Sequence, residues 1–356
     1  MKFSVWNKLV RNKLAFASMA IIIMAILVAI FAYFISPDSS PNGNRMIPEI
    51  ANKQPGYNAT FLLVKRNEQL LSASSCVHRL LYGQEDAFIY VPITNYAQDK
   101  DRVVAEKYID DGITSKITYH LQQLPEVFIK HQKFYLGTDR FGRDILSRVI
   151  IGTRVSLGVG LIAVIVSLTI GILLGAIAGY FKGFADDIIT WFINVIWSIP
   201  TLLLVFAITI VIGKGFWQVF IAVGFTLWVS VARIVRGQVL AVSKIDYVEA
   251  AKALGYGRLR IIIKHILPNI MGPVIVVAAG NFASAIVIEA GLSFLGIGVQ
   301  PPQPSWGLMI KENYNFIITH NPVIALIPGV AIMLLVLAFN LLGNALRDAM
   351  DSKTGD

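Results

Sequence analysis

The chain has 356 residues, of which 55% are hydrophobic and only 15% are charged. The charges fall in blocks between uncharged runs too long for the core helices of soluble domains, so the composition excludes a compact water-soluble protein and indicates an all-α polytopic membrane protein. The net charge of +9 reflects membrane topology, and we expect no nucleic-acid partner.

The N-terminal segment combines a basic stretch with the first apolar run. Four apolar residues at helical spacing between lysines predict an amphipathic helix on the inner membrane surface, although a frayed basic tail fits them as well. These residues are Phe3, Trp6, Leu9 and Val10. The run Leu14–Ile35 is too long for the core of a typical cleaved signal, so we expect residues 1–36 to hold a retained first span.

Residues 37–134 form a polar insertion between the first and second spans, which predicts a small mixed subdomain. Thr60–Val64 and Ala87–Val91 have the composition of strands. Cys76 is the only cysteine, which excludes an intrachain disulfide. A loop of this length translocates regardless of its charge, so we expect the insertion to be extracytoplasmic. Its histidines lack ligand spacing, and we expect no metal site.

Two carboxylates, Asp139 and Asp144, precede the second span and resemble a catalytic pair. Their basic neighbours Arg140, Arg143 and Arg148 favour structural ion pairing instead.

Five further uncharged runs are long enough to cross a hydrocarbon core of about 30 Å at about 1.5 Å per residue. They are Val155–Phe181, Ile188–Gly213, Gly215–Ala232, Ile266–Ile288 and Asn321–Leu346. The sequence therefore predicts six transmembrane helices, of which the second to sixth lie in a core of residues 135–350. Lys and Arg concentrate on the side of the N-terminus, which places both termini and the tail 351–356 in the cytoplasm.

Small residues on the second span predict close helix packing. They are Gly158, Gly160, Gly171, Gly175 and Gly179.

A short polar segment, residues 244–265, connects the fourth and fifth spans on the cytoplasmic side. Ser243 with Asp246 has the spacing of a capping box, and Gly255 is typical of the position just beyond a helix end. We expect a second short basic helix from Gly257 to His265, after which Pro268 starts or kinks the fifth span.

Polar residues within the spans are candidates for the transport path. Asn194, Asn281 and Ser284 either face such a path or bond neighbouring helices. Glu289 is either functional or simply reaches the outer water. Trp306, in the motif Gln300–Gly307, joins them as a candidate for an outer gate.

Four blocks occur in the order found in the C-type permease subunit of oligopeptide and dipeptide ABC importers, which this chain resembles. The blocks are Leu136–Asp144, Glu249–Pro268, Gly291–Gly296 with Gln300–Gly307, and Phe339–Gly343. The resemblance covers Phe134 to Met350 together with the N-terminus and first span. The insertion is longer than the family's usual connection, so nothing is carried over for residues 42–130.

The resemblance implies a type I ABC importer permease core in a bacterial or archaeal cytoplasmic membrane. It implies that the segment 244–265 is a coupling helix on which an ATPase docks, through the residues Glu249, Ala250, Ala251, Gly255, Ile266, Leu267 and Pro268. The implied partners are a homologous B-type permease, two cytoplasmic ABC ATPases, an extracytoplasmic peptide-binding protein and the lipid bilayer.

The chain lacks a Gly-x-x-x-x-Gly-Lys-Ser/Thr loop, so we expect ATP and Mg²⁺ on the partner ATPases and no cofactor on this chain. It also lacks Gly-x-Ser-x-Gly and His-Glu-x-x-His motifs, which argues against an intramembrane enzyme, and we assign no catalytic residue. Peptides are the expected cargo. Nickel chelates, glutathione and oligosaccharides remain the alternative, since related permeases carry them.

Overall fold

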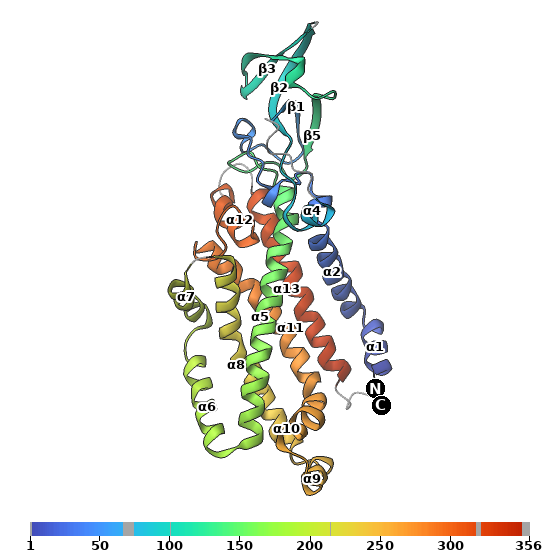
Figure 1. Ribbon diagram of the computed structural model, residues 1–356, viewed down its shortest axis with the longest axis vertical. Helices are drawn as coiled ribbons and strands as arrows, with labels where there is room; N and C mark the ends of the chain where they lie inside the picture. Colours follow the sequence, from blue (N-terminus) through green and yellow to red (C-terminus); the bar gives the residue numbers. More distant parts are fainter. Residues whose placement is uncertain (1, 67–74, 100, 214, 318–321, 351–356) are drawn as a thin grey trace. The chain divides into compact units, whose positions relative to one another are not determined.

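The computed structural model describes residues 2–66, 75–99, 101–213, 215–317 and 322–350, most of which are helical (Figure 1). Contacts divide the chain into two units. The first unit comprises Met1–Ile26, Ser156–Gln300 and Ala331–Asp356, and the second comprises Leu27–Val155 and Pro301–Val330. The long helices α2, α5 and α13 contribute residues to both units.

Five of the described helical segments are long and apolar enough to cross a membrane. They are α2 (Lys13–Ile30), α5 (Ile145–Phe181), α8 (Phe216–Val242), the continuous segment Arg258–Phe294 that ends in α11 (Leu267–Phe294), and α13 (Val323–Met350). These confirm five of the six predicted spans, with α5 beginning ten residues earlier than the predicted Val155.

The predicted third span, Ile188–Gly213, is broken in the structure. It forms α6 (Gly183–Trp197) and α7 (Thr201–Ile212), which meet at 94° and make a sixth span only if the bent pair counts as one. Pro200 explains the break, because proline donates no backbone hydrogen bond and disfavours helical geometry at the residue before it. The helix α6 therefore ends at Trp197 with Ser198 as its C-cap, and Pro200 becomes the N-cap of α7.

Close packing of α5 against α8 confirms the prediction from the small residues. A Cβ on Gly171 would lie 2.5 Å from the Val231 side chain, and one on Gly179 would lie 2.8 Å from the Arg236 carbonyl oxygen. Gly160 faces the Phe282 ring in the same way, at 2.3 Å. A side chain at Gly171 or Gly179 would therefore separate α5 from α8, and one at Gly160 would displace the Phe282 ring of α11.

The N-terminus is helical, as the amphipathic pattern predicts, and forms α1 (Lys2–Arg11). Leu9 is buried with Ala15, Ala345 and Ala349, so this helix packs beside the end of α13. Trp6 and Val10 stay exposed.

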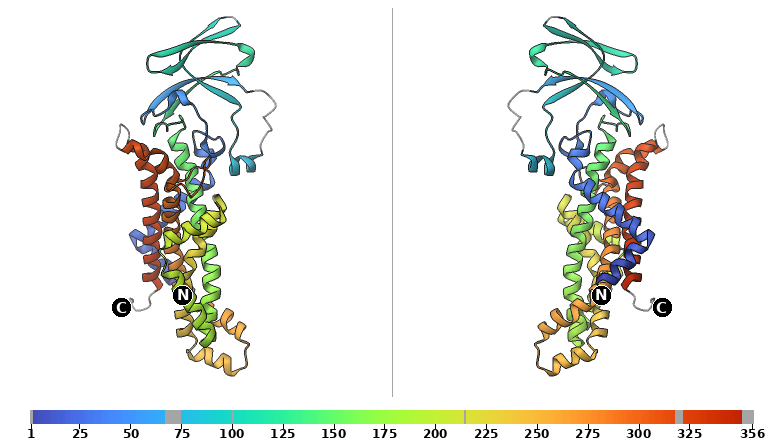
Figure 2. Two further views of the ribbon diagram at one scale, coloured as in Figure 1. Left: turned by 90° about the vertical axis from the view of Figure 1, so that its left-hand side faces the viewer. Right: turned by 90° about the vertical axis from the view of Figure 1, so that its right-hand side faces the viewer.

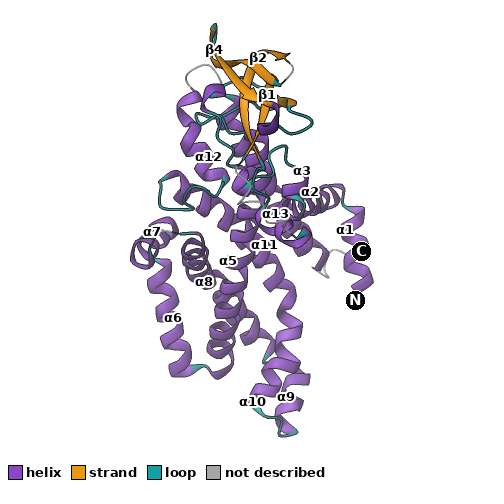
Figure 3. Cartoon of the chain, turned by 45° about the horizontal axis from the view of Figure 1, so that its top comes forward, coloured by secondary structure: helices purple, strands orange, loops and turns teal. Residues whose placement is uncertain are grey.

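The second unit contains a five-stranded antiparallel sheet in the order β4-β3-β2-β1-β5, drawn in orange in Figure 3. The strands are β1 (Tyr57–Lys65), β2 (Phe88–Asp99), β3 (Arg102–Asp110), β4 (Ile113–His120) and β5 (Ile129–Phe134). Consecutive strands β2, β3 and β4 form hairpins, which can be followed in Figure 2. Both strand predictions, Thr60–Val64 and Ala87–Val91, are confirmed, the second with its start one residue later.

The central strand β1 is buried on both faces because its alternating side chains enter two separate cores. Leu62 and Val64 pack in one core with Val91. Phe61 and Leu63 pack in the other. Short helical elements complete this unit: α3 (Ala32–Ile35), η1 (Pro41–Gly43), η2 (Pro48–Ile50), α4 (Cys76–Tyr82), η4 (Leu121–Gln123), α12 (Trp306–Asn313) and η6 (Tyr314–Ile317).

Candidate functional site

The segment between α8 and α11 begins with a turn that differs from the predicted capping box. Ser243 is the C-cap of α8, and its hydroxyl donates to the Leu240 carbonyl oxygen at 3.1 Å. The next helix, α9 (Asp246–Ala253), has Ile245 as its N-cap and no side-chain cap. The capping-box prediction is therefore wrong, because the Ser243 hydroxyl is already used within the last turn of α8.

The end of α9 confirms the prediction for Gly255. Its φ is +77°, and its N–H donates to the Lys252 carbonyl oxygen at 3.0 Å. The next N–H, of Tyr256, donates to the Ala251 carbonyl oxygen at 3.1 Å. These two bonds form a Schellman motif, which stops the helix and reverses the chain.

One face of α9 is part of an apolar core. Val248 and Ala251 are buried in the same cluster as Ile261, Ile262 and Ile266. This cluster holds α9 against the start of the next helical segment.

Polar contacts add to this core. The Lys252 ammonium donates to the Ser243 carbonyl oxygen at 3.1 Å, which ties the end of α9 to the end of α8. The Tyr247 hydroxyl donates to the His265 carbonyl oxygen at 3.3 Å, and the Tyr256 and His265 rings stack at 5.9 Å. The segment is thus fixed at both of its ends.

The predicted separate helix from Gly257 to His265 is instead the first part of the next span. The helix α10 (Arg258–Ile261) passes without a break through a π-turn, η5 (Ile262–Ile266), into α11. Pro268 explains the wider turn, since a proline ring clashes with the carbonyl four residues earlier in a regular α-helix. The segment that follows α9 is therefore one continuous helix from Arg258 to Phe294.

The structure places the predicted docking residues on two sides of this segment. Glu249, Ala250, Gly255 and Pro268 are exposed, and Leu267 is half-buried.

Ala251 and Ile266 are buried, so they position the segment and do not contribute to its surface. Two further residues are prominent at its tip: Leu254 is 74% exposed and Leu259 is 70% exposed. Sequence reasoning missed them because their helical periodicity does not distinguish an exposed leucine from a core leucine.

The candidate path residues of the first unit have different surroundings. The Asn281 amide donates to the Leu227 carbonyl oxygen at 3.2 Å and accepts from the Ser230 hydroxyl at 3.1 Å, so it joins α11 to α8. Ser284 is exposed. Asn194 accepts from Arg233 at 3.5 Å.

Glu289 is fully buried and accepts from the Ser293 hydroxyl at 2.6 Å. The interpretation that Glu289 reaches outer water is therefore wrong for this structure.

In the second unit, Trp306 is buried, and its indole N–H donates to the Val149 carbonyl oxygen at 3.0 Å. It packs over Gly152, where a Cβ would lie 3.0 Å from the indole ring. Trp306 thus locks α12 onto the start of α5.

Buried ion pairs in the second unit confirm the structural interpretation of Asp139. Its carboxylate lies 2.6 Å from Arg143 Nε, and both side chains are 2% exposed. Arg143 also pairs with Glu312 of α12 at 2.8 Å, and Arg148 approaches the same carboxylate at 3.4 Å. Asp144 forms no ion pair with any described residue and caps α5 by accepting from the Ser147 N–H at 3.0 Å.

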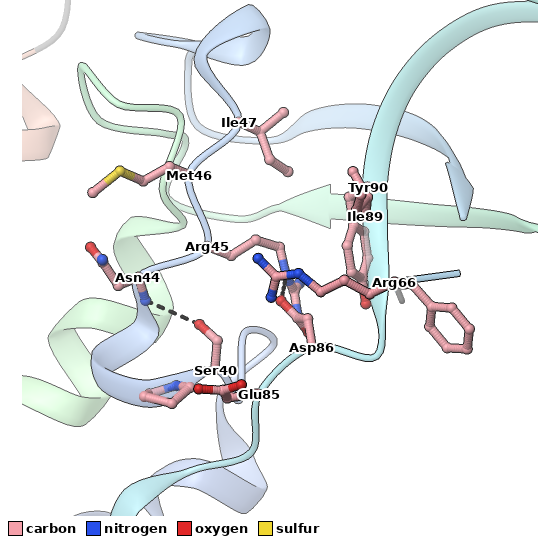
Figure 4. A pocket seen from close by; sticks show the side chains of 12 residues that line it. Ser40, Asn44, Arg45, Met46, Ile47, Arg66, Glu85, Asp86, Ile89 and Tyr90 are labelled. Atoms are coloured by element: carbon pink, nitrogen blue, oxygen red, sulfur yellow. Dashed lines mark hydrogen bonds and ion pairs between the residues drawn. The ribbon is translucent and has the colours of Figure 1, made fainter. Parts of the chain in front are cut away.

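A cavity of about 410 Å³ lies between residues 40–47 and the start of β2 (Figure 4). The Arg45 guanidinium forms two bonds to the Asp86 carboxylate, at 2.6 and 2.5 Å, and stacks on Tyr90 at 4.0 Å. Burial alone lowers the pKa of Arg45, but the hydrogen bonds that it donates to Asp86 and the charges of Asp38 and Asp86 outweigh burial and raise that pKa. Arg45 therefore ties this segment to the sheet as a permanent cation.

Comparisons with known proteins identify the family. Residues 171–356 match the binding-protein-dependent transport system inner membrane component, and residues 4–55 match the N-terminal transmembrane domain of oligopeptide transport permease C.

Curated relatives agree with these matches. The chain is 42% identical over 219 residues to the glutathione transport system permease protein GsiD of Pectobacterium atrosepticum, covering 62% of this chain and 72% of that protein. It is 43% identical over 221 residues to the di/tripeptide transport system permease protein DppC of Pseudomonas aeruginosa, covering 62% and 73%. It is 39% identical over 219 residues to the oligopeptide transport system permease protein OppC of Bacillus subtilis, covering 62% and 72%. The first family match spans more than half of the chain, which is thus a member of the family of binding-protein-dependent transport system inner membrane components.

Proposed function

We propose that the chain is the permease subunit of an ATP-driven importer for dipeptides or oligopeptides, with a type I ABC importer permease core. The observation that carries this proposal is the joint match to the permease family and to the N-terminal domain of oligopeptide transport permease C. Glutathione is the second candidate cargo, since a relative at 42% identity is named for it. The chain itself is not the catalyst in this proposal.

Energy enters through the exposed tip formed by α9 and α10. Two cytoplasmic ATPases supply it, each gripping one permease, and hold ATP and Mg²⁺. Glu249 and Ala250 offer a small, charged surface, while Leu254 and Leu259 offer apolar side chains that a groove on the ATPase would bury. Exposed leucines on a short polar segment suit such a protein interface, because apolar contacts at an interface centre supply much of the affinity.

The remaining assembly follows the family. A homologous B-type permease completes the path, an extracytoplasmic binding protein delivers the cargo, and both termini lie in the cytoplasm of a bacterium or archaeon.

Docking of the ATPases is tested by truncating the two exposed leucines of the tip formed by α9 and α10. Leu254→Ala and Leu259→Ala should each weaken recovery of the ATPases on a tagged permease by roughly tenfold or more, because burying a leucine side chain contributes about 1.5–3 kcal/mol. Leu81→Ala is the matched control, since this leucine of α4 is 48% exposed and lies outside the docking segment. Unchanged recovery in both tip variants would contradict docking at this tip.

Cargo is tested separately with the complex in proteoliposomes. ATP-dependent uptake of labelled di- to pentapeptides supports the proposal. Uptake of glutathione alone would replace it with the second candidate.

A further inference from the structure

A groove runs along α11 in the first unit, toward the end of α8 and α11 that is joined to α9. Two adjoining cavities of about 230 and 210 Å³ share Val276, Val277 and Arg347. The helix α11 forms the floor, while α8 and α13 form the walls. A Cβ on Gly272 would lie 2.9 Å from the Met350 sulfur, so the end of α13 lies beside the start of α11.

The wall formed by α13 presents three polar side chains to this groove. Asn340, Asn344 and Arg347 are spaced four and three residues apart, which places them on one helix face. All three are exposed and make no side-chain hydrogen bond or ion pair within the described part of the chain. Asn281, also in the groove, differs because its amide is already bonded to α8.

Lipid is a poor occupant for this face. Asn340 lies ten residues before Met350, or about 15 Å along the helix, so the polar row reaches well into an apolar span. Polar and ionisable side chains at such depth are costly in hydrocarbon and mark paths for ions or substrates. The row therefore requires a polar occupant.

The residues that line the groove indicate which chemical groups the occupant carries. Amides both donate and accept hydrogen bonds, as the peptide backbone does, and they do so independently of the cargo's side chains. The apolar floor of Val276 and Val277 accommodates varied side chains. Among the described residues, Arg347 is the only charged one that lines either cavity, and a guanidinium binds a carboxylate through paired hydrogen bonds.

We propose that this groove is the inner part of the peptide path, in which Asn340 and Asn344 bind the backbone and Arg347 binds the C-terminal carboxylate. The proposal rests on the proposed peptide importer. A packed helix of the second permease and a lipid chain are the competing occupants, and the following test separates them.

Access of a thiol reagent to the groove is measured on the complete complex in proteoliposomes, in a chain whose native thiol is removed by Cys76→Ser. Asn344→Cys should react with a charged methanethiosulfonate reagent supplied on the α9 side, and trialanine should slow that reaction during ATP-driven uptake. Leu334→Cys is the matched control: it is 44% exposed on the same helix, does not line the groove and should not react. An unreactive Asn344→Cys, or a reaction that trialanine does not slow, would overturn the proposal.

The role of Arg347 is tested with the same protection measurement. Arg347→Gln should raise the trialanine concentration for half-protection about tenfold, equivalent to about 1.4 kcal/mol, because the paired charge-assisted hydrogen bonds to the carboxylate are lost. C-terminally amidated trialanine should protect both proteins equally, and Arg11→Gln is the charge-matched control. Equal protection of Asn344→Cys with and without Arg347→Gln by free trialanine would refute this role. Peptide uptake by a complex whose groove is not protected would refute this inference alone, whereas a wild-type complex that imports no peptide would refute the proposed function.

Discussion

The Schellman motif at Gly255 gives a prediction in which backbone geometry and surface bulk can be separated. Gly255 has a φ of +77°, and, apart from its chain neighbours, no described residue has a heavy atom within 4 Å of the position a Cβ would take. The cost of a side chain in the isolated chain is therefore conformational. For an ordinary residue this cost is about 1–2 kcal/mol, or about a 5- to 30-fold loss of the native helix end.

Gly255→Val should consequently reduce ATPase recovery on a tagged permease by about that factor, because valine resists the left-handed region. Gly255→Asn is the matched variant, since asparagine tolerates this region at helix ends. If only backbone geometry matters, asparagine keeps recovery close to wild type. If the ATPase also approaches this position closely, both variants lose recovery. Wild-type recovery with Gly255→Val, measured at limiting ATPase concentration, would refute the argument from the helix end.

Three further predictions concern the second unit and the orientation. Cys76 is exposed and should react with an impermeant thiol reagent from outside intact cells, whereas Lys252→Cys should react only after permeabilisation; labelling of Lys252→Cys in intact cells would reverse the topology. Glu312→Gln should destabilise the protein by about 3–5 kcal/mol because it leaves the buried Arg148 without an ion-pair partner among the described residues and leaves Arg143 with Asp139 alone. Glu49→Gln, at a more exposed pair, should cost about 0–1 kcal/mol, and thermal unfolding in detergent measures both. Burial raises the pKa of Asp144, so the wild type should gain stability relative to Asp144→Asn as the pH falls through that pKa. Asp144→Ala should lose about 1 kcal/mol of stability because the cap of α5 is removed. A stability difference between wild type and Asp144→Asn that does not change with pH would contradict the burial argument.

The spans could be predicted because their signal is local. A run of about 20 apolar residues is sufficient to identify a membrane helix, and five such runs match the described helices. The break at Pro200 was missed because a proline within an apolar run either kinks the helix or ends it, and the surrounding packing decides which. At Pro268 the surrounding packing has the opposite effect. The helix continues there, because the π-turn accommodates the proline ring.

The buried ion pairs show where local reasoning fails. The neighbours of Asp139 correctly indicated Arg143 as a partner, because the two residues are four apart. The second partner of Arg143, Glu312, is 169 residues away, and only the fold brings them together. Exposed Leu254 and Leu259 were missed for a related reason, since exposure depends on which face of a short helix meets the core.

The docking segment and the transmembrane helices share one apolar core, which has a mechanical consequence. Val248 and Ala251 of α9 belong to the same buried cluster as Val235 and Val239 of α8, and as Ile270 of α11. Packed cores transmit displacement and are not continuously deformable, so a push on α9 moves both helices together.

The helix α5 follows this movement because Gly175 leaves no space between it and α8. A Cβ there would lie 2.5 Å from the Ala232 carbonyl oxygen and 2.8 Å from the Val235 side chain. In the proposed importer, the ATPase therefore moves a three-helix body through a contact made by one short helix. The helix α13 packs on this body as well, since the Phe282 and Phe339 rings stack at 4.0 Å and a Cβ on Gly343 would lie 3.3 Å from the Ala279 side chain.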